Sequence, residues 1–126
     1  MSSKKPEKKA EKKEDKDDSV LTGVLGTTKD LSSLIDYQEN AVVSKMLLKK
    51  KNGNVTLFAF DGQGLSEHSA PFDALVQGLD GDATIMIAGK PNKVAKDQVI
   101  VMPANKPHAI VVRAGTKFKM LLVMIS

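Results

Sequence analysis

Short apolar segments rich in β-branched residues alternate with turn residues along most of the chain, and this pattern limits the folds open to it. No segment after residue 40 has a helical period, and the connections are too short for the crossovers of a parallel sheet. The sequence therefore predicts an all-β sandwich or barrel, an architecture that also protects strand edges. The expected strands span residues 41–48, 54–60, 73–79, 83–88, 98–102, 109–113 and 118–125, with turns at 80–82, 89–92, 103–107 and 114–115.

The connection between the first two expected strands reads Lys49-Lys50-Lys51-Asn52-Gly53-Asn54. Asn-Gly is typical of a tight hairpin turn, so we expect residues 41–60 to form a β-hairpin. The three lysines form a compact basic run, but the chain has a single Arg and a single Tyr, and acidic residues are interspersed with the basic ones. We interpret the run as a solvated turn and expect no nucleic-acid partner.

The first 18 residues repeat two lysines followed by an acidic residue, with seven Lys against six Asp and Glu. A helix would stack like charges four residues apart and would have no apolar face to bury, so we expect this tail to be disordered. The composition becomes apolar from Ser19, and residues 19–126 are expected to form a single domain. Asp30, placed as an N-cap before Leu31, Leu34 and Ile35, predicts one short helix at the start of this domain.

The composition excludes several classes of protein. Because the chain has no Cys, it has no disulfide framework, thiolate metal site or cysteine nucleophile. It has no apolar run long enough to span a bilayer and no apolar segment of the kind found in signal peptides, so we expect a cytoplasmic protein without a membrane partner. In the absence of Trp, we expect Phe58, Phe60, Phe72 and the six Met, including Met86, Met102 and Met120, to fill the core.

Each of the two histidines ends a distinctive motif. His68 ends the stretch Gly64-Leu-Ser-Glu-His, and His108 ends the stretch Val101-Met-Pro-Ala-Asn-Lys-Pro-His. Together with Leu79-Asp-Gly-Asp-Ala, these motifs resemble those of small single-domain cupins of the RmlC-like superfamily, and the resemblance extends over roughly residues 31–125. It implies a double-stranded β-helix, or jelly-roll, barrel. It also implies a homodimer in which N-terminal strands swap or pack across a twofold interface.

The first cupin motif contains a His-x-His pair followed by a glutamate and a closing glycine. Aligned on this motif, His68 takes the place of the second histidine and Ser66 takes the place of the first. Counting forward from His68 puts Asp73 at the acidic position, whereas counting back from Gly81, the closing glycine, puts Ala74 there. The motif is therefore present in a degenerate form.

The second cupin motif is matched at Pro103 and His108. Cupins that bind iron, manganese, nickel or zinc use three histidines and a glutamate, so the resemblance implies a metal site made of His68, His108 and Asp73. This ligand set is incomplete, and water would supply the missing ligands. Two imidazoles and one carboxylate also form the ligand set of facial-triad iron sites.

Strand alternation predicts which residues share a face with His68. Residues two apart on a strand point to the same side, so Ser66 and His68 should face the barrel interior together while Glu67 points outward. Gln63 and Gln77 are further candidates for polar residues that line the cavity.

The residues leave other readings open. Each histidine alone is equally consistent with a hydrogen bond to a neighbouring backbone group or with capping of a strand end. Three functions are compatible with the sequence. The first is a small cupin that binds a small polar molecule, with or without a divalent metal. The second is a metal-dependent dioxygenase or isomerase, and the third is a non-catalytic sensor or structural homodimer.

Overall fold

The computed structural model describes residues 19–126, so the predicted disorder of residues 1–18 lies outside the described residues. The strands are β1 Ser19–Val20, β2 Val42–Lys50, β3 Gly53–Asp61, β4 Leu65–His68, β5 Asp73–Ile87, β6 Lys90–Ala95, β7 Val99–Met102, β8 His108–Val111 and β9 Lys117–Ile125. The predicted all-β class and the hairpin of β2 and β3 are confirmed. Within residues 19–126 no helical segment is long and apolar enough to cross a bilayer.

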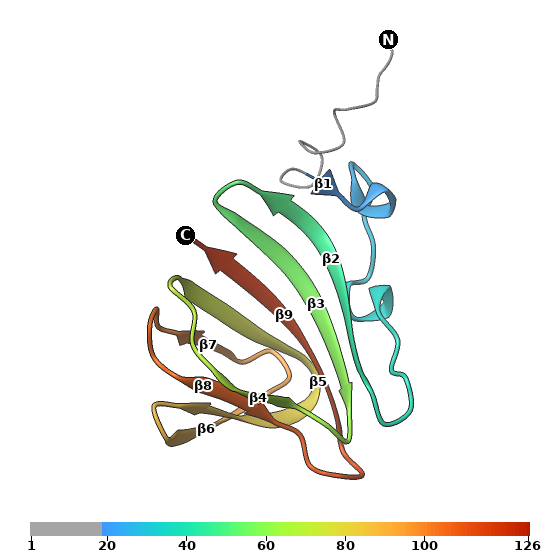
Figure 1. Cartoon of the computed structure of the whole chain (residues 1–126). Helices are drawn as coiled ribbons and strands as arrows, with labels where there is room; N and C mark the ends of the chain where they lie inside the picture. The colour runs from blue at the N-terminus through green and yellow to red at the C-terminus, as the bar shows by residue number, and fades with distance from the viewer. Residues whose placement is uncertain (1–18) are drawn as a thin grey trace.

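Two curved layers of strands face each other and share strand β5 (Figure 1). One layer has the order β1-β2-β3-β9-β5-β7, and the other has the order β6-β5-β8-β4. Neighbouring strands are antiparallel throughout these ladders, as expected for a chain whose connections are short. The interior between the layers is therefore lined by alternate residues of each strand.

Strand β5 belongs to both layers because it bends at Gly78 to Gly81. Its first part pairs with β7 and β9, its last part pairs with β6 and β8, and the register with β9 shifts between Gly78 and Asp80. The predicted turn at residues 80–82 is wrong, since these residues form a bulge inside one continuous strand. Gly81 has a φ of +70°, and a Cβ at this position would overlap the Lys117 carbonyl oxygen.

Strand β6 occupies residues for which the sequence predicted a turn, residues 89–92. The actual turn is shorter and consists of Ala88 and Gly89, after which Pro91 lies inside β6 opposite Met86. Strand β6 pairs only with β5, so it is an edge strand. An edge strand tolerates a proline because the missing N–H faces away from the ladder.

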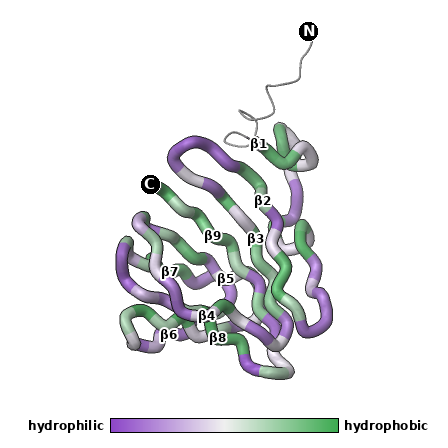
Figure 2. Tube along the Cα trace, viewed as in Figure 1, coloured by the Kyte–Doolittle hydropathy of each residue, from purple (hydrophilic) through white to green (hydrophobic). Residues whose placement is uncertain are grey.

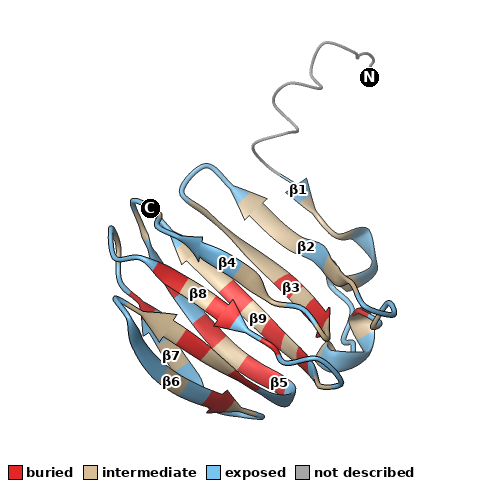
Figure 3. Ribbon diagram, turned by 60° about the horizontal axis from the view of Figure 1, so that its bottom comes forward, coloured by how far each residue is buried: buried red, intermediate tan, exposed pale blue. Residues whose placement is uncertain are grey.

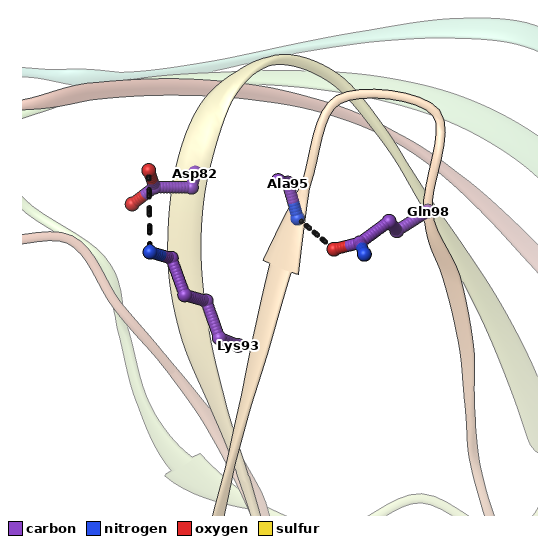
Figure 4. A network of polar contacts seen from close by, with 4 residues as sticks. All are labelled: Asp82, Lys93, Ala95 and Gln98. Carbon is purple, nitrogen blue, oxygen red and sulfur yellow. Dashed lines mark hydrogen bonds and ion pairs between the residues drawn. The ribbon is translucent and has the colours of Figure 1, made fainter.

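The connection from β6 to β7 is fastened by a side chain. The Gln98 Oε1 accepts a hydrogen bond from the Ala95 N–H at 2.9 Å (Figure 4). The same figure shows Asp82 and Lys93 facing each other across β5 and β6, with 3.9 Å between the carboxylate and the ammonium. Both of these side chains are more than half exposed, so the pair adds little to stability.

The main core fills the space between the layers, where the buried residues of β3, β5, β8 and β9 meet (Figure 3). Phe60, Phe118 and Met120 are fully buried, and the Phe60 and Phe118 rings stack with 6.0 Å between their centroids. The core roles predicted for Phe60, Met102 and Met120 are confirmed. The other buried members are Ala74, Val76, Ala83, Ile85, Val94, Ile110, Val112 and Leu122.

A second cluster lies on the outer face of the first layer. Leu57, Ala59 and Leu79 are buried there beneath Ile35 and the residues around it. The covering segment contains 3₁₀ turns at Thr22–Val24 and Leu31–Leu34 in place of the predicted short helix. An α-helix is therefore not supported, although a 3₁₀ turn lies at the predicted position. The Asp30 carbonyl oxygen accepts both the N–H and the hydroxyl of Ser33, and the Asp30 side chain makes no cap.

Tyr37 holds this N-terminal segment onto the barrel. Its hydroxyl donates to the Asp80 carboxylate at 2.5 Å, and the Lys117 and Lys119 ammonium groups lie 5.2 and 5.0 Å from its ring centroid. Burial, followed by the hydrogen bond to Asp80, raises the pKa of the phenol well above its usual value. The phenol therefore stays protonated and can donate this hydrogen bond throughout the physiological pH range.

Replacing Gly81 should test how closely β5 and β9 must approach. We expect Gly81→Ala to destabilise the protein by more than the roughly 1–2 kcal/mol that a left-handed backbone costs an alanine, because the added methyl also meets the Lys117 backbone. Gly89→Ala is the matched control, since Gly89 has a φ of +80° but no atom within 4 Å of an added Cβ. Urea unfolding of both variants measures the difference, and equal losses would contradict the expectation.

Candidate functional site

Several strand ends meet at one end of the barrel, which we call the mouth. The mouth consists of residues 49–54, 68–72, 87–90, 103–108 and 124–126, which lie along one side of the molecule in Figure 1. The loops are joined by backbone hydrogen bonds from Asn105 to Ala70 at 2.7 Å and from Ala88 to Pro107 at 2.8 Å. The pairings of Gly53 and Asp73 with Ile125 bring the remaining segments to the same end.

The two histidines lie side by side at the mouth. His68 and His108 are register partners at the ends of β4 and β8, and their ring centroids are 4.5 Å apart with the rings at 72°. His108 is 5% exposed, whereas the His68 side of the pair is open to solvent. The structure thus brings together the two histidines that the sequence assigns to one site, and their role as ligands stays a prediction.

A bulge in β4 changes which residue shares a face with His68. Leu65 pairs with Ile110 and His68 pairs with His108, so the four residues 65–68 of β4 lie opposite the three residues 108–110 of β8. Leu65 and His68 consequently point to the same side, and Leu65 packs against the main core. The strict alternation that predicted Ser66 beside His68 does not hold across this bulge, and the Ser66 residue is exposed.

Both imidazoles are oriented by the backbone two residues earlier. The His68 Nδ1 lies 3.1 Å from the Ser66 carbonyl oxygen, and the His108 Nδ1 lies 3.2 Å from the Lys106 carbonyl oxygen. A carbonyl oxygen only accepts, so each neutral ring carries its proton on Nδ1 and keeps a lone pair on Nε2. The predicted alternative, a hydrogen bond from each histidine to the backbone, is thus present, and it leaves both Nε2 atoms available to a ligand.

Burial lowers the pKa of His108, and the neighbouring His68 lowers it further, while the hydrogen bond to Lys106 acts in the opposite direction. The neutral form of His108 is therefore favoured in the folded protein near neutral pH. A neutral imidazole is the form that ligates a metal or accepts a hydrogen bond.

The other predicted site residues do not join the histidine pair in a group that could hold a metal within residues 19–126. The Asp73 carboxylate accepts the Ala104 N–H at 2.8 Å and so fastens the 103–107 loop. Gln63 donates to the Asn40 carbonyl oxygen. Ala74 and Val76 of β5 point into the core and are buried. Gln77 alternates with them, as Asp73 and Leu75 do, so it lies on the outer face. Among residues 19–126 no three His, Cys, Asp or Glu side chains converge on a common metal position.

Sequence reasoning missed a small cavity at the mouth. Its volume is about 160 Å³, and it is lined by Lys49, Lys50, Lys51, Gly53, Asn54, Phe72, Met124 and Ser126. Phe72 was expected in the core and lines this cavity instead, because it lies in the loop that follows β4. The lysine run was the available signal, but it could not show that a barrel mouth lies beside the turn.

The pKa of His108 predicts how stability depends on pH. A histidine whose folded pKa is lowered binds fewer protons when folded than when unfolded, so stability should fall as the pH drops below about 6.5 and level off below the folded pKa. We expect His108→Gln to flatten this part of the profile. His68→Gln should keep most of it, because the burial of His108 remains.

Thermal unfolding of the three proteins between pH 5 and pH 7.5 is the measurement, with the pH taken in small steps across about 6.5. Parallel profiles for the wild type and His108→Gln would contradict this account of His108.

Comparison with solved structures identifies several similar proteins. A conserved protein of unknown function from Streptococcus pyogenes is 36% identical, with a TM-score of 0.74 over 81% of this chain and 89% of that one. A cupin superfamily protein from Desulfitobacterium hafniense is 34% identical, with a TM-score of 0.70 over 75% of this chain and 86% of that one.

A third similar structure, a Cupin 2 conserved barrel domain protein from Leptotrichia buccalis, is 42% identical, with a TM-score of 0.71 over 75% of this chain. The match covers 46% of that longer chain. No family model matches the sequence, and no curated protein matches it. The identity to a cupin over most of both chains agrees with the jelly-roll layers and the paired motif histidines, and the protein therefore belongs to the cupin superfamily.

Proposed function

We propose that this cupin binds a small polar molecule at its mouth, with His68 and His108 as its polar contacts and a divalent transition metal held between them. The observation that carries the proposal is the orientation of the two rings. Each Nδ1 points to a backbone carbonyl, and the two rings lie 4.5 Å apart with their Nε2 lone pairs unused within residues 19–126. Backbone carbonyls orient metal-binding histidines in the same way.

The donor set indicates which ions would suit the site. Neutral imidazole suits zinc, nickel, iron and manganese to different degrees, and the chain offers no thiolate to compete. Two protein ligands leave several coordination positions to water or to a bound molecule, so a metal would supply a Lewis acid for an oxygen of the ligand. Asp73 fastens the 103–107 loop, and among residues 19–126 no third His, Cys, Asp or Glu side chain joins the histidine pair, so the proposed site consists of the two histidines alone.

The measurement that tests this proposal is thermal unfolding of protein without an affinity tag, titrated with zinc, nickel, manganese or iron(II). At a metal concentration ten times the Kd, linkage raises the free energy of unfolding by about 1.4 kcal/mol. We expect His68→Ala and His108→Ala to abolish the rise, and Asp73→Asn to keep it. A rise that survives in either histidine variant, or metal bound at less than about a tenth of an equivalent by the wild type, would contradict the metal part of the proposal.

A second property, assembly as a homodimer, is favoured by the outer face of the first layer. Leu75, Val99, Val101 and Ile125 are 36%, 59%, 51% and 64% exposed. The register places them on adjacent strands, and β7 leaves one edge open. An exposed apolar patch of this kind is matched best by another such patch, and a second copy of the chain provides it.

Sedimentation at increasing concentration should give the mass of two 13.6 kDa chains for the wild type. Leu75→Lys, which puts a charge at the centre of this face, should give the mass of one chain. Val111→Lys is the matched control, because Val111 is 43% exposed on β8 in the other layer. A wild type that stays monomeric at high concentration would contradict the dimer.

A further inference from the structure

A bulge in β2 turns Lys49 toward the mouth. Met46 pairs with Thr56 and Leu48 pairs with Val55, so one extra residue of β2 lies between these pairs. Strict alternation from Met46 would have put Leu48 on the inner side. The bulge shifts the alternation of side chains along β2 by one residue, so the Lys49 side chain lies on the same side of the sheet as that of its register partner Asn54.

The side chains of Lys49 and Asn54 present hydrogen-bond donors to the cavity. The Asn54 Oδ1 accepts the Thr56 hydroxyl at 3.0 Å, which leaves the two N–H groups of Asn54 Nδ2 free to donate. Within residues 19–126 the Lys49 ammonium has no carboxylate partner and no hydrogen bond. An ammonium group and an amide N–H on neighbouring strands suit an anion, because both donate hydrogen bonds to it.

The opposite part of the cavity is apolar. Phe72 comes from the loop after β4, and Met124 comes from the last part of β9. In Figure 2 the hydrophilic β2–β3 turn adjoins the hydrophobic end of β9. The cavity between them therefore has a polar part and an apolar part. The cavity volume of about 160 Å³ is close to that of an engineered cavity that holds benzene.

From these contacts we infer that the mouth binds a small carboxylic acid of about the size of benzoate. The carboxylate lies against Lys49 and Asn54, and the apolar body packs on Phe72 and Met124. The described residues that line this cavity include no histidine, so the inference goes beyond the proposed function and assigns a second ligand site at the mouth. The cavity and the histidine pair lie at the same end of the barrel, and Phe72 of the cavity belongs to the loop that follows His68.

The size and the mixed lining of the cavity favour this class over other anions. A nucleotide exceeds the volume of the cavity, and inorganic phosphate would leave Phe72 and Met124 without a contact. A neutral amide of the same shape would leave the Lys49 charge unpaired in the partly enclosed cavity. Discrimination between benzoate and benzamide is therefore the property that this geometry predicts.

The experiment is a titration of the metal-free full chain with benzoate and with benzamide, followed by calorimetry and by amide chemical shifts. We expect benzoate to bind and to shift the amides of residues 49–54 and 72, with affinity that falls as salt is raised. Lys49→Met should weaken benzoate binding about tenfold or more, because a charge-assisted contact is lost. Lys96→Met is the matched control, since Lys96 is exposed beside Gly78, away from the mouth.

Three results would overturn the inference: equal binding of benzamide, unchanged benzoate binding by Lys49→Met, or no benzoate binding at about 10 mM. His68→Ala and His108→Ala separate this inference from the proposed metal site. If both variants keep benzoate binding while the wild type binds no metal, the metal proposal fails and the acid site stands. If the wild type binds metal but no benzoate, the acid site fails and the metal site stands.

Discussion

The close backbone contact between β5 and β9 is the constraint on which the rest of this structure depends. At Gly81 the backbones of β5 and β9 approach so closely that no side chain fits between them. At Gly78 the backbone of β5 approaches the Ala95 backbone equally closely. These contacts allow one strand to cross from the first layer to the second without ending. The layers can then enclose a single core, and the ends of β4 and β8 are brought to the same mouth as the β2–β3 turn.

Most of the fold could be predicted from the sequence because alternation and turn residues report directly on strands. The hairpin of β2 and β3 and the strands β7 and β9 lie close to their expected positions. The errors at residues 80–82 and at Pro91 share a cause. Gly, Asp and Pro mark turns in isolation, but tertiary pairing can place a glycine in a bulge and a proline on an edge strand.

The site was predicted in part. His68 and His108 are identified by their motifs, and the structure pairs them. Asp73 and Ser66 are predicted by counting along the first motif, and such counting does not show where a bulge adds a residue, as it does in β4. Gln77 is predicted only by its polarity, and it lies on the outer face of β5. Lys49 could not be predicted as a residue of the mouth for the same reason. The sequence indicates a solvated turn, and only the extra residue in β2 directs the Lys49 side chain toward the mouth.

The attachment of the N-terminal segment has a consequence for how the protein opens. Residues 31–37 rest on the outer face through the Ile35 cluster and the bond from Tyr37 to Asp80, whereas β5 and β9 lie in the centre of the sheet. We therefore expect the segment to detach as a separate cooperative unit while the barrel stays closed. Amide hydrogens of the Leu31–Leu34 turn would then exchange with solvent through this local opening, and those of β5 only through unfolding of the whole domain. Two levels of stability are thus expected within residues 31–126.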